Sequence, residues 1–224
     1  MGATNSASGK QTRFYSLKAK ASAEETPHFV LSEKINDKWQ QTQKFDTITG
    51  LLNSAEIKEK EYQGAKFNVF VIELQDDSET SKIEMTHNSI TYSLINSLAS
   101  KVSKLDNYAI QVYRKKGTGK DGKTYWNGSA AIKVNGSSEL QKWSIDPQSA
   151  PKKTPVLLGN GKPFIKDGKQ VWDDTDVKIF WEDIFKKQVV DKLTPSSSQP
   201  QSTFTGNEIP SVEPPTGEPD DLPF

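Results

Sequence analysis

The feature that most constrains the fold is a succession of β-patterned segments with one helical pattern among them. Residues 66–75 (KFNVFVIELQ) are rich in β-branched and aromatic residues and form the strongest predicted strand. Four other strands are predicted, over residues 43–57, 80–87, 108–115 and 124–134. The first of these is long, and Gly50 within it permits a bulge or a sharp bend.

The helical pattern lies between the third and fourth of these five strands. Asn88 or Ser89 can cap it. Apolar residues then recur at helical spacing, at Ile90, Leu94, Ile95, Leu98 and Val102. Three strands, a helix and two strands is the order of a five-stranded OB barrel. We therefore expect a mainly β protein in which residues 43–134 form an OB-type barrel with an inserted helix.

Patterns outside the barrel predict additions at both ends. Alternation over residues 13–20 and 28–35 predicts an extra N-terminal β hairpin. A C-terminal extension, residues 135–195, should hold a strand over 139–145 and a hairpin around Asp167-Gly168. It should end in an amphipathic helix over 176–193 that packs on the barrel through Val177, Phe180, Trp181, Ile184, Phe185, Val189 and Leu193. The predicted domain is thus residues 12–195, after a flexible start at 1–11.

The charge is distributed unevenly, although the net charge is zero. Residues 196–224 contain five acidic residues and no Lys or Arg, so residues 1–195 carry a net charge of +5. This last segment is rich in Ser, Pro and Thr and is expected to be disordered. The chain has no cysteine and only two histidines, which argues against disulfides, metal sites and histidine-dependent catalysis. No cofactor, no membrane span and a cytoplasmic location are expected.

The chain ends in a specific motif, Asp220-Asp221-Leu222-Pro223-Phe224. It resembles the C-terminal tip of bacterial and phage single-stranded DNA-binding proteins, in which acidic residues precede Ile or Leu, Pro and a terminal Phe. The resemblance implies a non-enzymatic protein that coats single-stranded DNA in replication, recombination or repair. It also implies that these five residues bind partner proteins. The rest of the chain does not closely resemble the family, which fits a divergent, phage-encoded member. A homo-oligomer is compatible with this reading.

Single-stranded nucleic acid requires aromatic faces for base stacking and a basic groove for phosphates. Alternation along the last two barrel strands places Trp126 in the core and presents Tyr113 and Tyr125 as stacking residues. The candidate phosphate contacts around them are Arg114, Lys115, Lys116, Lys120, Lys123 and Lys133. Phe67 and Trp39 are further candidates for stacking.

Two other functions fit parts of the sequence. Residues 117–124 (GTGKDGKT) match the phosphate-binding pattern GxxxxGK[ST] of P-loop triphosphatases. The pattern requires a following helix, whereas Tyr125-Trp126-Asn127-Gly128 is a poor first helical turn and Asp121-Gly122 favours a hairpin. The other alternative is an interaction adaptor with weak affinity for DNA, in which the loop lysines have no role in binding.

Overall fold

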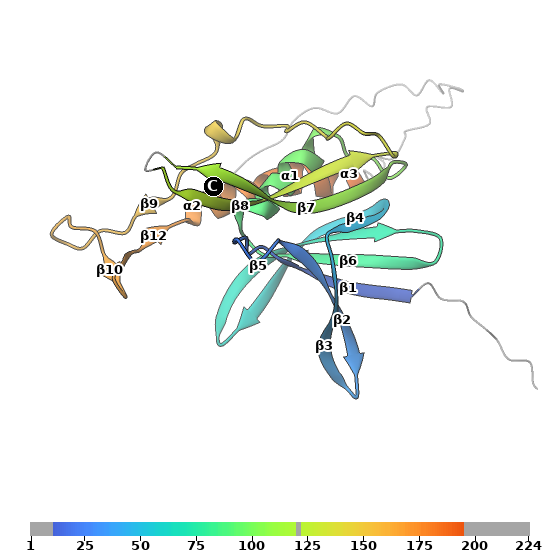
Figure 1. Cartoon of the computed structure of the whole chain (residues 1–224), viewed down its shortest axis with the longest axis horizontal. Coiled ribbons are helices and arrows are strands. Elements are labelled where there is room, and N and C mark those ends of the chain that lie inside the picture. Colours follow the sequence, from blue (N-terminus) through green and yellow to red (C-terminus); the bar gives the residue numbers. More distant parts are fainter. Residues whose placement is uncertain (1–10, 120–121, 195–224) are drawn as a thin grey trace, which may run out of the picture.

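The computed structural model describes residues 11–119 and 122–194, and these form a mainly β protein. One eight-stranded sheet dominates it, with the strand order β3-β2-β1-β6-β5-β4-β7-β8 (Figure 1). The strands are β1 (Gln11–Lys18), β2 (His28–Ile35), β3 (Lys38–Phe45), β4 (Thr47–Tyr62), β5 (Ala65–Gln75), β6 (Glu79–Met85), β7 (Asn107–Thr118) and β8 (Thr124–Val134). The mainly β class and the order of the five central strands therefore agree with the prediction.

The sheet is not closed into a barrel. Strand β4 pairs with both β5 and β7, β5 pairs with β6, and β7 pairs with β8, all antiparallel. The second edge of β6 is taken by β1, which runs parallel to it with Tyr15 opposite Ile83. Because β1 occupies this edge, β6 does not pair with β8, and the predicted five-stranded barrel stays open.

The predicted strand over residues 43–57 is wrong in its first part. Asn36 and Asp37 adopt positive φ angles of 50° and 62°, which turn the chain back into the separate strand β3. Strand β4 begins only at Thr47 and extends to Tyr62. It does contain an irregularity, between Leu52 and Ser54, close to the predicted position at Gly50. The N-terminal addition is therefore three strands rather than a two-stranded hairpin.

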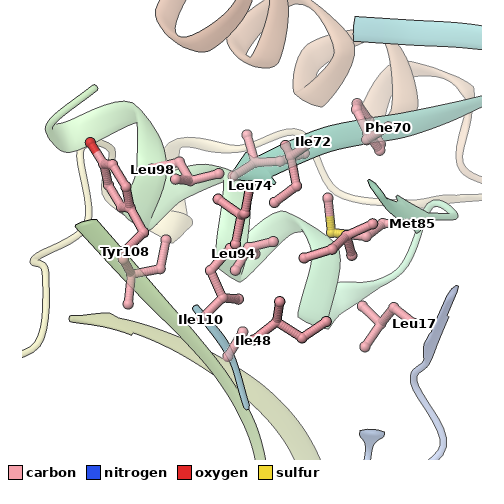
Figure 2. Packing of buried hydrophobic residues seen from close by; sticks show 14 of the residues in the cluster. Leu17, Ile48, Phe70, Ile72, Leu74, Met85, Leu94, Leu98, Tyr108 and Ile110 are labelled. Atoms are coloured by element: carbon pink, nitrogen blue, oxygen red, sulfur yellow. The ribbon is translucent and has the colours of Figure 1, made fainter. Parts of the chain in front are cut away.

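Helix α1 (Ser89–Ser100) is confirmed with its predicted cap. The Asn88 side chain accepts hydrogen bonds from the backbone N–H groups of Ile90 and Thr91, at 3.0 and 2.9 Å. The apolar face of α1 lies in one hydrophobic cluster with side chains from seven of the strands, as Figure 2 shows around Leu94 and Leu98. Burial of this face holds the helix against the inner side of the sheet.

The predicted C-terminal helix is present, and one part of it has π-helical geometry. It consists of α2 (Thr175–Phe185), a π-helical turn (Lys186–Val190) and α3 (Asp191–Leu193), which follow one another without a break. Five residues of the predicted stripe are buried, namely Val177, Trp181, Phe185, Val189 and Leu193. Phe180 and Ile184 are partly buried against the same cluster. The stripe thus packs on the body of the protein, as expected.

The strand predicted at residues 139–145 is wrong. This segment has no regular secondary structure. Hydrogen bonds join it to β8 and α1. Gln141 donates a backbone hydrogen bond to the carbonyl of Ile132, at 2.8 Å. The side-chain amide of Asn96 both donates to and accepts from the backbone of Ile145, also at 2.8 Å. A side chain therefore satisfies the backbone groups that a strand partner would otherwise take.

Residues 154–173 form a projecting arm after a 3₁₀ turn at Pro147–Ser149. Its base is the pair β9 (Thr154–Pro155) and β12 (Trp172–Asp173), and the pair β10 (Ile165–Lys166) and β11 (Lys169–Gln170) lies further out. The turn between β10 and β11 has positive φ at Asp167 and Gly168, which confirms the predicted hairpin. No helix within 11–119 and 122–194 is long and apolar enough to cross a membrane.

Candidate nucleic-acid interface

One face of the β7–β8 hairpin is buried, as its alternation predicts, and the other is mostly half-buried and becomes exposed at Lys115, Tyr125 and Asn127. Tyr108, Ile110 and Val112 of β7 lie opposite Val134, Ile132 and Ala130 of β8, and all six are buried. Burial of these side chains beneath the hairpin fixes the register. The odd-numbered residues of both strands must therefore point away from the helices.

The outward face carries four of the candidates. Tyr113 lies opposite Ser129, Lys115 opposite Asn127, and Tyr125 opposite Gly117. Lys133 is on the same face, opposite Ala109. Tyr113 is half-buried and the Lys115 ammonium lies 5.5 Å from its ring centroid, whereas Tyr125 is 48% exposed. Because Tyr125 is opposite Gly117, the two tyrosines are separated by four residues along the strand direction, a distance of about 13 Å.

Arg114 lies on the opposite face from these candidates. Its Nη1 donates hydrogen bonds to the carbonyls of Ser22 and Ala23, both at 2.6 Å. Its guanidinium carbon is 4.5 Å from the ring centroid of Trp126. The structure thus places Arg114 between β7 and the β1–β2 connection, away from Tyr113. Trp126 does face the core side, as predicted, but it is half-buried beneath Arg114 rather than fully enclosed.

The segment that matches the P-loop pattern forms the predicted hairpin. The N–H of Gly119 donates to the carbonyl of Lys123 at 2.8 Å, and the N–H of Gly122 donates to the carbonyl of Gly119 at 3.0 Å. Thr124 then begins strand β8, so no helix N-terminus follows the glycines. Lys116 and Lys123 are exposed at this end of the hairpin. Lys120 lies outside the described residues, as do Asp220, Asp221, Leu222, Pro223 and Phe224 of the terminal motif.

Phe67 and Trp39 share the outward face of the sheet but lie far from the β7–β8 hairpin. Phe67 is opposite Lys60 near the end of the β4–β5 hairpin. Trp39 lies near the start of β3, six residues or roughly 20 Å of strand before Phe45, whereas the next residue, Asp46, accepts a hydrogen bond from Val112 of β7. It contacts Phe14 edge-on, with 5.4 Å between the ring centroids. The structure therefore does not bring these two residues together with Tyr113 and Tyr125.

Phe14 was missed by the sequence analysis. With Trp39 it lines a hollow of about 380 Å³ on the outward face, together with Ser32, Lys60 and Glu84. Its neighbour Tyr15 is buried, so the alternation of β1 turns Phe14 outward. That alternation was visible in the sequence, but which of the two rings faces outward depends on the pairing of β1 with β2 and β6.

Ion pairs separate the lysines of the sheet into two groups. On β4, β5 and β6 the lysines are matched by carboxylates, in the pairs Lys58–Glu56, Lys60–Glu84, Lys66–Glu59 and Lys82–Glu73. Lys115 and Lys133 on the outward face of β7 and β8 have no ion pair with a described residue. Lys116 has none either, but it lies opposite Trp126 on the face that carries Arg114. The outward face of β7 and β8 thus carries lysines without an ion pair to a described residue beside Tyr113, as β1 and β3 do at Lys18, Lys38 and Lys44.

A partly buried polar cluster joins the C-terminal helix to the sheet on the other face. His87 Nε2 is 3.0 Å from Glu182 Oε1 on α2, and its Nδ1 is 3.1 Å from the Tyr92 hydroxyl. Asn68 of β5 donates to the second oxygen of Glu182 at 3.0 Å. Burial lowers the pKa of His87, and the nearby Glu182 carboxylate partly opposes this effect. Burial raises the pKa of Tyr92. This cluster links secondary-structure elements and lies apart from the candidate residues.

Comparison with family models, curated proteins and solved structures finds no match for this chain.

Proposed function

We propose that this chain binds single-stranded DNA and has no catalytic activity. The observation that carries the proposal is the outward face of the β7–β8 hairpin, where Tyr113 and Tyr125 lie on the same side as Lys115 and Lys133, two lysines without an ion pair to a described residue. Tyrosine rings offer stacking surfaces to any base, and free ammonium groups attract phosphates. The proposed role is to coat single strands during replication, recombination or repair.

The pairing of strands β4 to β8 supports a comparison of the β7–β8 hairpin with the nucleic-acid-binding loops of OB barrels. In an OB barrel the first strand pairs with the second and the fourth, and a helix often lies between the third and fourth. Strands β4 to β8 reproduce these pairings around α1, although β1 takes the edge at which such a barrel would close. OB barrels bind oligonucleotides through the loops between strands 1 and 2 and between strands 4 and 5. In this chain those are the β4–β5 and β7–β8 hairpins.

The terminal motif supports a second role, the recruitment of partner proteins. Phe224 presents a ring and an α-carboxylate together, which suits an apolar pocket rimmed by basic residues. Asp220 and Asp221 add salt-sensitive attraction to such a pocket. We propose that partners of the replication or recombination machinery bind this tip while the β7–β8 face holds DNA.

Charge removal on the proposed face tests the function. We expect the double substitution Lys115→Gln and Lys133→Gln to weaken binding to oligo(dT), because two phosphate contacts are lost. Each lost contact should make the log–log salt dependence shallower by about 0.7, from roughly −3.5 if five phosphates are bound. The measurement is fluorescence anisotropy of labelled oligo(dT) over a salt series, with duplex DNA and RNA of the same length for comparison.

The matched control is Lys58→Gln with Lys82→Gln, which also removes two positive charges from the sheet. Both of these lysines are already paired with carboxylates, so the salt dependence should stay closer to that of the unchanged chain. If the two double variants lose affinity equally, only net charge matters and the β7–β8 site is refuted. If neither loses affinity although the tip still captures partners, the chain is an adaptor.

A further inference from the structure

The arm, residues 154–173, buries almost none of its own side chains. Only Val156, Gln170 and Val171 are half-buried, and all the other residues of the arm are exposed. Its backbone is nevertheless paired, through β9 with β12, β10 with β11, and bonds such as that from Val171 N–H to the carbonyl of Phe164, at 2.9 Å. The arm is thus a hydrogen-bonded extension without a core.

Large apolar side chains are exposed along the arm. They are Leu157, Leu158, Phe164, Ile165 and Trp172. Ile165 is 54% and Trp172 52% exposed. A group of apolar side chains of this size on one projecting segment is typical of a surface that another molecule covers.

The charge of the arm indicates what kind of molecule that is. Lys162, Lys166 and Lys169 have no ion pair with a described residue, and the acidic residues of the arm are Asp167 and Asp173. Lys152 just before the arm is likewise without an ion pair to a described residue. The arm therefore combines aromatic rings with a net charge of +1 and with lysines that have no ion pair to a described residue, as Lys115 and Lys133 of the β7–β8 hairpin have none.

The arm and this hairpin also extend toward the same end of the molecule. Along the longest axis in Figure 1, the arm projects beyond the β7–β8 hairpin at the left of the view. A strand bound on the outward face of the hairpin and running toward its turn would leave the sheet at this end. The arm is placed where the next part of such a strand could be contacted.

We propose that the arm is a second contact site for single-stranded DNA, with Trp172 and Phe164 as stacking residues and Lys162, Lys166 and Lys169 as phosphate contacts. The inference rests on the proposed function and extends it, because it lengthens the bound segment beyond the hairpin. An acidic protein or a second copy of the chain is the competing occupant. Aromatic rings interspersed with lysines that have no ion pair to a described residue favour nucleic acid over either one.

The test uses the full chain with Lys162→Gln, Lys166→Gln and Lys169→Gln together. For long oligo(dT), the log–log salt dependence of binding should become shallower by about 2, since three contacts are lost. A short oligo(dT) that covers only the hairpin should bind as before. The control is Lys58→Gln, Lys66→Gln and Lys82→Gln, in which the removed charges are already paired with carboxylates.

Substitution of Trp172 separates stacking from charge. Trp172→Ala should weaken binding to long oligo(dT) by roughly tenfold, whereas Trp172→Phe keeps a stacking ring and should retain most of the affinity.

The arm proposal is overturned if the unchanged chain binds but the arm variants match it at every oligonucleotide length. It is also overturned if these variants change only the sedimentation behaviour, which would identify the arm as a contact between copies. Failure of the unchanged chain to bind any single strand refutes the proposed function itself.

Discussion

Gly128 illustrates how a single residue determines the packing beneath the candidate face. It lies on the inward side of β8, opposite Arg114. A Cβ at this position would lie only 2.3 Å from Cδ1 of Ile90 and 2.9 Å from Cγ of Pro27. Because Ile90 is buried in the core, it has little room to move away. Glycine is therefore required here for close approach and not for an unusual φ angle.

We expect Gly128→Ala to lower the free energy of unfolding by about 1–3 kcal/mol, as overpacking does in other cores. Chemical denaturation monitored by circular dichroism measures this change. Gly159→Ala is the control, because a Cβ there contacts nothing within 4 Å and the φ angle is not in the left-handed region. Equal stability of the two variants would contradict the close packing of β8 against α1.

At the scale of elements, the C-terminal helix is held to the sheet by a titratable contact. His87, between β6 and α1, bonds to Glu182 of α2 and to Tyr92 of α1. The pKa of His87 is lowered in the folded protein, so the unfolded chain binds a proton first as the pH falls. The unfolded chain binds a proton at His87 near pH 6.5, whereas the folded protein does so only at lower pH. His87 therefore contributes its full share to the free energy of unfolding above about pH 6.5, and this share is lost as the pH falls from there to the pKa of His87 in the folded protein.

The free energy of unfolding should thus fall between pH 7 and about pH 5.5, with a slope of at most about 1.4 kcal/mol per pH unit from this one proton. His87→Gln should flatten the decline, since glutamine does not titrate. His28→Gln controls for the loss of any histidine, because His28 lies at the start of β2 and its ring bonds to the carbonyl of Thr26. A decline of the same steepness in His87→Gln would show that another group is responsible.

Much of this element structure was predictable because it depends on local patterns. Strands β2 and β8 have the predicted bounds, and α1 has its predicted cap. The Asn36-Asp37 turn also has a local signal, because Asn and Asp tolerate positive φ. The open edge of the barrel could not be inferred, because the parallel pairing of β1 with β6 joins segments about seventy residues apart.

The candidate site was predictable to a similar degree. Alternation correctly placed Tyr113 and Tyr125 opposite the buried face of the hairpin. The local pattern could not show that the Arg114 side chain bonds to the carbonyls of Ser22 and Ala23, because that contact spans more than ninety residues. Nor could it show which lysines are paired with carboxylates on neighbouring strands.

At the scale of the whole molecule, a basic body is joined to an acidic segment. Residues 1–195 carry +5 and residues 196–224 carry −5. Opposite charges on one chain attract at low ionic strength, and salt screens this attraction over about 10 Å at 0.1 M. The acidic segment should therefore compete with DNA phosphates for the basic residues of the body.

Removal of residues 196–224 should tighten the binding of single-stranded DNA at low salt, and the difference should shrink as salt rises. Anisotropy titrations of the full and shortened chains measure it, with removal of Phe224 alone as the control that leaves all five acidic side chains in place. Unchanged or weaker binding by the shortened chain would contradict the competition.

The central claim is that the outward face of the β7–β8 hairpin binds unpaired bases, and one titration tests it most directly. The chain without residues 196–224 is titrated with labelled oligo(dT) in dilute buffer, alone and with Tyr113→Ala and Tyr125→Ala. The account predicts saturable binding, weakened in each variant by on the order of 1–3 kcal/mol because a stacked base is lost. No binding by the unsubstituted body, even at the lowest salt, would contradict it.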